Sequence, residues 1–165
     1  MAKRETKPLW KKDEVEARLR PYSQRLNPNS YYEGASLSRP AGMRRAHVTL
    51  VHLPPGKDSF AYHAHMLEEE WIYVLSGRGI ATIAGEEHEV GPGDFMGFAT
   101  PSVAHLLSNP FETELVYLMG GESLPLDVID YPTIGKRYAL VAGEKGAEFH
   151  ELKDPIRPFG RADKD

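Results

Sequence analysis

Between residues 45 and 120 the hydrophobic positions fall in short runs, and each run ends at a cluster of Gly, Pro, Asn or Ser. The runs are rich in β-branched and aromatic side chains, and their apolar positions do not recur at helical spacing. This pattern is typical of antiparallel strands in a sandwich or barrel. It predicts strands over residues 47–53, 71–75, 80–83, 89–90, 95–98, 105–108 and 114–119.

The N-terminal part of the chain follows a different pattern. Asp13 and Glu16 have the spacing of a capping box, which predicts a short helix that Pro21 ends. Between residues 20 and 42, Pro, Asn, Ser and Tyr recur without periodicity, so this segment is expected to be irregular and to wrap over the rest of the protein.

The C-terminal part is less regular than the central zone. Residues 126–132 are expected to form a loop that carries two acids, residues 137–141 one more strand, and residues 153–165 a loose polar tail. The domain organisation expected is therefore an N-terminal arm over residues 1–45, a barrel core over residues 46–121, and a C-terminal part over residues 122–165 that packs on the barrel.

The charge and composition of the chain argue against some kinds of binding partner. The 165 residues carry a net charge of −4, but residues 1–25 hold eight basic and four acidic side chains and so form a basic arm on an acidic body. Nucleic acid is not expected as a partner, because its binding requires clustered positive charge. No apolar stretch is long enough for a membrane helix and the start lacks a secretory signal, so a cytoplasmic protein without a membrane partner is expected.

Cysteine is absent from the chain, whereas histidine occurs seven times. Disulfides, thiolate nucleophiles and cysteine-based zinc sites are therefore excluded. Imidazole and carboxylate groups remain as the strong metal ligands that the sequence can offer.

One segment combines these two kinds of ligand. His63 and His65 are two residues apart, so on a strand they lie on the same face and can chelate one divalent ion. Of the three glutamates that follow, Glu70 shares parity with the apolar positions of the next strand and is the best third ligand. His105, at the start of a later strand, is the candidate for a fourth. The alternative is that the histidine pair and the glutamates are only a solvated surface.

These residues belong to a longer pattern that resembles the cupin superfamily. Its first motif has Gly, His-x-His, Glu and Gly in this order, and here Gly56, residues 63–65, Glu70 and Gly77 follow it. Its second motif runs from Gly through Pro to a His with an Asn four residues later. Residues 93–109 follow that motif from Gly93 to Asn109.

Three features depart from the family pattern. The segments from Gly56 to His63 and from Gly93 to His105 are each about one residue longer than usual, and Val103 stands in a region where the family prefers glycine. These changes bear on the loops near the pocket and leave the four ligand types in place.

The resemblance implies a double-stranded β-helix, that is, a jelly-roll β-barrel, here with an irregular N-terminal arm containing a short helix. It also implies that His63, His65, Glu70 and His105 line the barrel and bind one divalent transition metal such as Zn, Fe, Mn or Ni, which ligand chemistry alone does not distinguish. The function expected is an enzyme that acts on a small polar sugar-, sugar-phosphate- or carboxylate-like molecule as an isomerase or a dioxygenase. The alternative is a non-catalytic module that binds or senses a small molecule. Cupins commonly form dimers, so a homodimer is expected.

Overall fold

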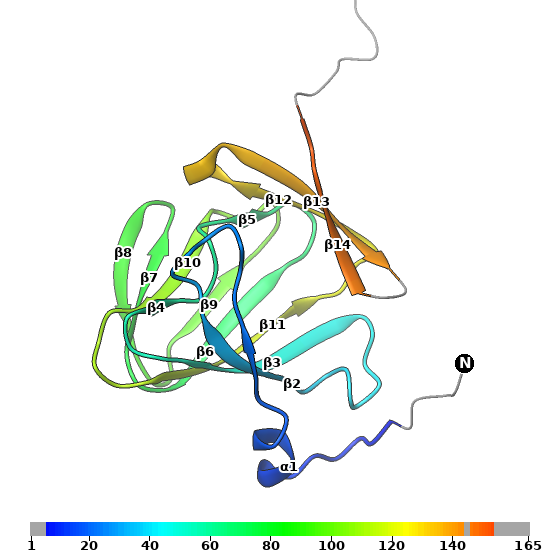
Figure 1. The fold of residues 1–165 in the computed structure, drawn as a ribbon, viewed down its shortest axis with the longest axis vertical. Coiled ribbons are helices and arrows are strands. Elements are labelled where there is room, and N and C mark those ends of the chain that lie inside the picture. The colour runs from blue at the N-terminus through cyan, green and yellow to red at the C-terminus, as the bar shows by residue number, and fades with distance from the viewer. Residues whose placement is uncertain (1–5, 144–145, 154–165) are drawn as a thin grey trace, which may run out of the picture.

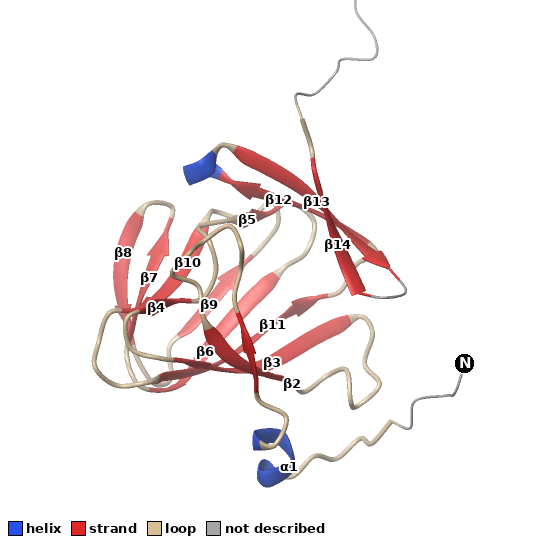
Figure 2. Cartoon of the chain, in the orientation of Figure 1, coloured by secondary structure: helices blue, strands red, loops and turns tan. Residues whose placement is uncertain are grey.

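The computed structural model describes residues 6–143 and 146–153. Its one α-helix in these ranges is α1 (Lys12–Glu16), which confirms the short helix. The capping box lies two residues earlier than the predicted pair Asp13 and Glu16, because Glu14 accepts a hydrogen bond from the backbone N–H of Lys11 at 2.9 Å. Nearly all other regular structure is antiparallel β-sheet, so the all-β prediction is confirmed (Figures 1 and 2). None of the helices in the described ranges has the length and hydropathy to cross a membrane.

The strands form three sheets. The first has six strands in the order β1-β2-β3-β11-β6-β9, the second has the order β4-β10-β7-β8, and the third has the order β14-β13-β12-β5. In chain order the strands are β1 (Arg20–Tyr22), β2 (Tyr32–Ser36), β3 (Ala46–Leu53), β4 (Lys57–Asp58), β5 (Ala64–His65), β6 (Glu70–Ser76), β7 (Gly79–Ile83), β8 (Glu86–Val90), β9 (Phe95–Phe98), β10 (His105–Asn109), β11 (Leu115–Glu122), β12 (Leu126–Tyr131), β13 (Lys136–Gly143) and β14 (Gly146–Glu151), with a 3₁₀-turn η1 (Pro132–Ile134) before β13.

The main hydrophobic core lies between the first two sheets. Alternate residues of β3, β6 and β11 point into it from one side, and those of β7 and β10 from the other, because successive side chains of a strand face opposite ways. Its most deeply buried members have no more than 2% of their surface exposed: Val51, Leu53, Val74, Ala81, Leu107, Leu115 and Tyr117. This layered packing is that of a jelly roll, as the resemblance implies.

The strands predicted in the central zone are all present, with bounds that differ by a few residues at most. The N-terminal arm is more regular than expected, because β1 and β2 extend the six-stranded sheet through the pairing of β2 with β3. The arm also crosses the barrel as predicted. Gln24 bonds the hydroxyl of Tyr131 and the backbone N–H of Ala61, and Asn27 bonds the carbonyl of Phe60.

The prediction of a loop over residues 126–132 is wrong. Six of these residues form β12, which pairs with β13 on one side and β5 on the other. The strand could not be recognised from the sequence because Asp127, an acidic residue, occupies a buried position of β12 where an apolar residue is expected. The strand predicted over residues 137–141 is confirmed as β13, and β14 adds a further strand beside it. The predicted polar tail lies outside the described residues from position 154 onward.

Candidate metal centre

The four candidate ligands come from three segments of the chain that meet at one end of the barrel. His65 lies on the short strand β5 and His63 directly precedes that strand, while Glu70 begins β6 and His105 begins β10. The backbones of His63 and His105 bond each other twice, with N···O distances of 3.1 and 2.7 Å. This bridge fixes the two strand starts side by side, and the alternation along β5 then brings His65 to the same face as His63.

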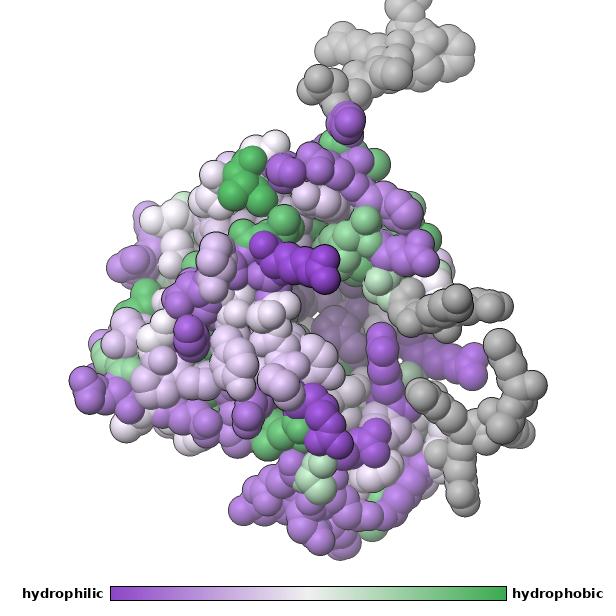
Figure 3. All heavy atoms as spheres, viewed as in Figure 1, coloured by the Kyte–Doolittle hydropathy of each residue, from purple (hydrophilic) through white to green (hydrophobic). Residues whose placement is uncertain are grey.

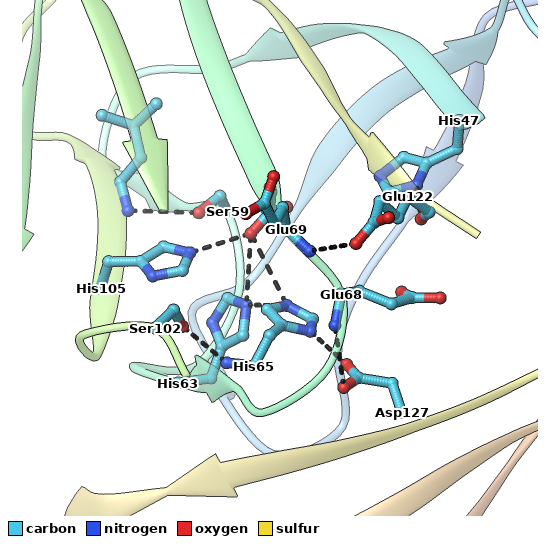
Figure 4. A network of polar contacts seen from close by, with 12 residues as sticks. His47, Ser59, His63, His65, Glu68, Glu69, Ser102, His105, Glu122 and Asp127 are labelled. Atoms are coloured by element: carbon cyan, nitrogen blue, oxygen red, sulfur yellow. Dashed lines mark hydrogen bonds and ion pairs between the residues drawn. The ribbon is translucent and has the colours of Figure 1, made fainter. Parts of the chain in front are cut away.

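The tips of the four side chains converge on one point. In Figure 4, dashed lines run from the rings of His63, His65 and His105 to one carboxylate oxygen. Oε2 of Glu70 lies 2.9 Å from Nε2 of His105, 3.6 Å from Nε2 of His65 and 3.9 Å from Nε2 of His63. The Nε2 atoms of His63 and His65 are 3.1 Å apart. The structure thus brings together every residue that the sequence nominated as a ligand.

The other ring nitrogen of each histidine is occupied by a hydrogen-bond acceptor. Nδ1 of His63 lies 2.8 Å from the carbonyl oxygen of Ala61, and Nδ1 of His105 lies 3.1 Å from that of Val103. Because a carbonyl oxygen only accepts, each of these nitrogens carries the hydrogen and each Nε2 of a neutral ring carries a lone pair. The lone pairs are directed at the point of convergence.

Burial and mutual charge set the protonation of the group. Burial lowers the pKa of His63 to about 4, against the opposing charge of Glu70. Burial acts to raise the pKa of Glu70, but the hydrogen bond that His105 donates when its Nε2 is protonated, together with the positive charge of protonated histidines, outweighs burial and lowers this pKa to about 2. A neutral His63 and an ionised Glu70 are the forms that ligate a metal.

The pKa of His65 is shifted in the opposite direction to that of His63. Burial acts to lower its pKa, but the hydrogen bond with Asp127 and the negative charge of Glu70 outweigh burial and raise it. Its backbone N–H also donates to the hydroxyl of Ser102 at 2.7 Å, which holds the end of β5 in place.

The ring of Phe98 holds His105 from the side of β9. Their ring centroids are 3.6 Å apart and the planes are almost parallel, at 5°. This stacking restricts rotation of the imidazole, so the direction of its Nε2 is fixed by packing as well as by hydrogen bonding.

This donor set fits a divalent transition metal. Three imidazole nitrogens lie within 3.9 Å of one carboxylate oxygen, and their lone pairs repel it unless a cation or protons lie between them. Nitrogen donors with a single carboxylate suit Zn, Fe, Mn or Ni better than Ca or Mg, which prefer oxygen.

A cavity of about 310 Å³ opens over this group. His63, His65 and Glu70 line one end of it, and the wall opposite includes Leu140 and Phe149 from the third sheet. In Figure 3 the surface is hollowed between the third sheet and the barrel, and most side chains on this face are hydrophilic. The cavity therefore joins a polar, ligand-rich end to an apolar wall, as small-molecule sites do.

Several residues in and around this cavity were not among the candidates that the sequence offers. Glu68, one of the three glutamates that follow the histidine pair, is only 9% exposed and lines the cavity. Asp127, which was predicted to lie in a loop, lies behind His65. Polar side chains at the rim are Gln24, Arg39, His47, Glu69 and Ser123. The alternation of Asp127, Ile129 and Tyr131 is a signal that would have placed Asp127 inside, once residues 126–131 were recognised as a strand.

Comparisons with known proteins agree with this architecture. A model of the cupin domain matches residues 49–121. The solved structure of a candidate sugar phosphate isomerase from Acidithiobacillus ferrooxidans is 34% identical, covers 90% of this chain and 96% of its own, and has a TM-score of 0.83. The chain belongs to the cupin superfamily.

Two further cupin structures show the fold at lower identity. A sugar phosphate isomerase from Silicibacter pomeroyi is 24% identical over 85% of this chain and 90% of its own, with a TM-score of 0.71. A predicted oxalate decarboxylase from Thermotoga maritima is 24% identical over 70% of this chain and 99% of its own, with a TM-score of 0.59. No curated protein matches the sequence.

Proposed function

We propose that this cupin binds one divalent transition metal through His63, His65, Glu70 and His105 and uses it to isomerise a small sugar-phosphate-like molecule. The observation that carries the proposal is the convergence of three imidazole Nε2 atoms and one carboxylate oxygen at the end of a cavity. The metal, when bound, would polarise an oxygen of the substrate as a Lewis acid.

The substrate class is supported by likeness and by the shape of the cavity. The relative from Acidithiobacillus ferrooxidans carries the name of a sugar phosphate isomerase and matches this chain over almost its full length. A cavity of about 310 Å³ suits a small molecule, and Arg39 at its rim offers a positive charge to an anionic group.

Isomerisation needs a group that accepts and returns a proton, and Glu68 is our candidate for it. Its side chain lines the cavity, and one oxygen accepts the backbone N–H of Leu124 at 2.5 Å, whereas the other oxygen has no hydrogen-bond donor among the described residues. A ligand atom of Glu68 lies within 4.8 Å of one of His65. The carboxylate thus stands next to the proposed metal ligands without being one of the four.

The experiment combines metal analysis with an assay for turnover. We expect about one transition metal per chain in protein purified without chelator, and aldose–ketose interconversion of phosphorylated sugars that Glu68→Gln reduces at least tenfold. Glu148→Gln, an exposed glutamate on β14, is the control and should leave the rate unchanged.

Other outcomes identify the alternatives. Oxygen uptake with a redox-active metal and no isomerisation would indicate a dioxygenase. A metal-loaded protein that binds sugar phosphates without converting them would support a binding or sensing module. Absence of metal from protein purified and then exposed to each candidate ion would contradict the proposal.

A further inference from the structure

Asp127 is a charged side chain placed inside the protein. It lies on β12 and is 1% exposed, whereas Asp130 on the same strand pairs with Arg137 at the surface. Within the described residues His65 is the only ion-pair partner of Asp127. A buried carboxylate is unfavourable unless its oxygens accept hydrogen bonds, so its place in the fold requires a compensating role.

Both oxygens of Asp127 act as acceptors (Figure 4). Oδ1 accepts the backbone N–H groups of Leu67 at 2.9 Å and Glu68 at 3.3 Å, and Oδ2 lies 2.5 Å from Nδ1 of His65. The same side chain therefore holds the turn that leads from β5 to β6 and the imidazole of one candidate ligand.

Each of the three histidines of the site has a hydrogen-bond acceptor at Nδ1, but the kind of acceptor differs. It is a backbone carbonyl for His63 and His105, whereas among the described residues the acceptor at Nδ1 of His65 is the carboxylate of Asp127. We infer that Asp127 is a positioning residue that keeps hydrogen on Nδ1 of His65 and so presents Nε2 of that ring to the metal. The inference rests on the proposed metal site and adds to it a residue outside the four ligands.

An asparagine at this position cannot do the same. Its amide has one acceptor oxygen, whereas Asp127 uses two. If the oxygen keeps the N–H groups of Leu67 and Glu68, the amide NH₂ faces His65 and requires a lone pair on Nδ1. The hydrogen of a neutral His65 then moves to Nε2, where it blocks ligation. The opposite orientation would place the NH₂ against two backbone N–H donors.

The first measurement is the protonation of each histidine nitrogen by ¹⁵N NMR, in metal-free protein at a mildly alkaline pH, where free imidazole is neutral. We expect hydrogen on Nδ1 of His65 in the wild type and none there in Asp127→Asn. His63 and His105 should keep hydrogen on Nδ1 in both proteins, because backbone carbonyls hold them. Asp130→Asn is the matched control on the same strand and should resemble the wild type.

The second measurement is the affinity for Zn²⁺, by competition with a chromophoric chelator. Asp127→Asn should weaken binding about 10- to 100-fold, as loss of a carboxylate behind a ligating histidine usually does. Asp127→Glu retains two acceptor oxygens and should keep more of the affinity than Asp127→Asn. Asp130→Asn should bind Zn²⁺ as the wild type does.

The two measurements separate this inference from the proposed function. Hydrogen retained on Nδ1 of His65 in Asp127→Asn, or missing from it in the wild type, would overturn the role of Asp127 even if Zn²⁺ binds. Failure of the wild type to bind Zn²⁺, Fe²⁺, Mn²⁺ or Ni²⁺ would instead overturn the metal site. If Asp127→Asn does not fold, the wild-type spectrum alone still decides the protonation of His65.

Discussion

The metal-binding role proposed for each histidine of this cupin depends on the contacts of its other ring nitrogen, Nδ1, and on the packing of its ring. The three histidines would be ordinary polar residues if their rings could rotate, but backbone carbonyls, Asp127 and the ring of Phe98 fix them. A ligand set held in advance loses less side-chain entropy on binding, so we expect the proposed metal to add to the stability of the fold.

Removal of a proposed ligand should abolish that added stability. At a metal concentration of 100 times the Kd, the wild type should gain about 2.7 kcal/mol of unfolding free energy over its metal-free form. His63→Ala and His105→Ala should each show little or no gain. His88→Ala, at an exposed position of β8, is the control. Thermal unfolding with and without chelator measures the difference, and an equal gain in all four proteins would contradict the prediction.

We expect the unfolding free energy to fall at alkaline pH because the hydroxyl of Tyr32 is buried. Burial raises the pKa of its hydroxyl from 10.0 to about 12, so between these values the folded form retains a proton that the unfolded chain loses. Stability from this residue is therefore complete below pH 10.0 and falls as the pH rises toward about 12. Denaturant unfolding across this range should show a smaller decline for Tyr32→Phe. An unchanged decline in that variant would show that Tyr32 does not contribute.

The position of Glu70 at the start of β6 depends on the close approach of β6 to the neighbouring strand β11. β11 pairs with both β3 and β6, and its Gly121 lies opposite Glu70. A Cβ atom at Gly121 would lie 2.3 Å from the carbonyl oxygen of Glu69 and 3.2 Å from Cα of Glu70. The absence of a side chain at this position thus allows β6 to begin where Glu70 can reach the histidines.

Gly121→Ala should therefore disturb both the fold and the site. We expect a loss of about 1–3 kcal/mol of unfolding free energy from overpacking, together with weaker Zn²⁺ binding because β6 must shift. Gly91→Ala is the control, since its Cβ would meet nothing closer than 4.0 Å. Chemical unfolding and chelator competition measure the two effects. Wild-type affinity in Gly121→Ala would show that the start of β6 does not set the position of Glu70.

Several large apolar side chains are exposed on the outer face of the six-stranded sheet. Tyr73 and Leu75 on β6 and Phe95 on β9 are 39%, 42% and 64% exposed. Large exposed apolar groups that lie together are typical of interaction surfaces. We propose that this face contacts a second copy, in keeping with the dimer that the family resemblance implies.

Light scattering tests this association directly. We expect a mass of twice 18.5 kDa for the wild type and a shift toward the single-chain mass for Phe95→Glu. Leu126→Glu, at an exposed position on the third sheet, is the control and should leave the mass unchanged. A wild-type mass of one chain would contradict the prediction.

Much of this protein can be inferred from local sequence because the physical rules involved are local. Alternation along a strand and turn residues at its ends predict the central strands, and the spacing of His63, His65 and Glu70 already places three ligands on suitable faces. His105 was a candidate because it begins a later strand, and its membership of the same ligand set was implied by the resemblance to the cupin motifs.

Other features depend on pairings between distant segments. Asp127 is 62 residues from His65, and only the pairing of β12 with β5 brings its carboxylate to that ring. Its acidic side chain interrupts the apolar alternation of β12, which is why the strand was predicted as a loop. The cavity likewise exists because the third sheet faces the barrel. Periodicity and spacing therefore specify the strands and the ligands, whereas tertiary contacts decide how each ligand is protonated and what covers it, because hydrogen-bond partners and burial come from remote residues.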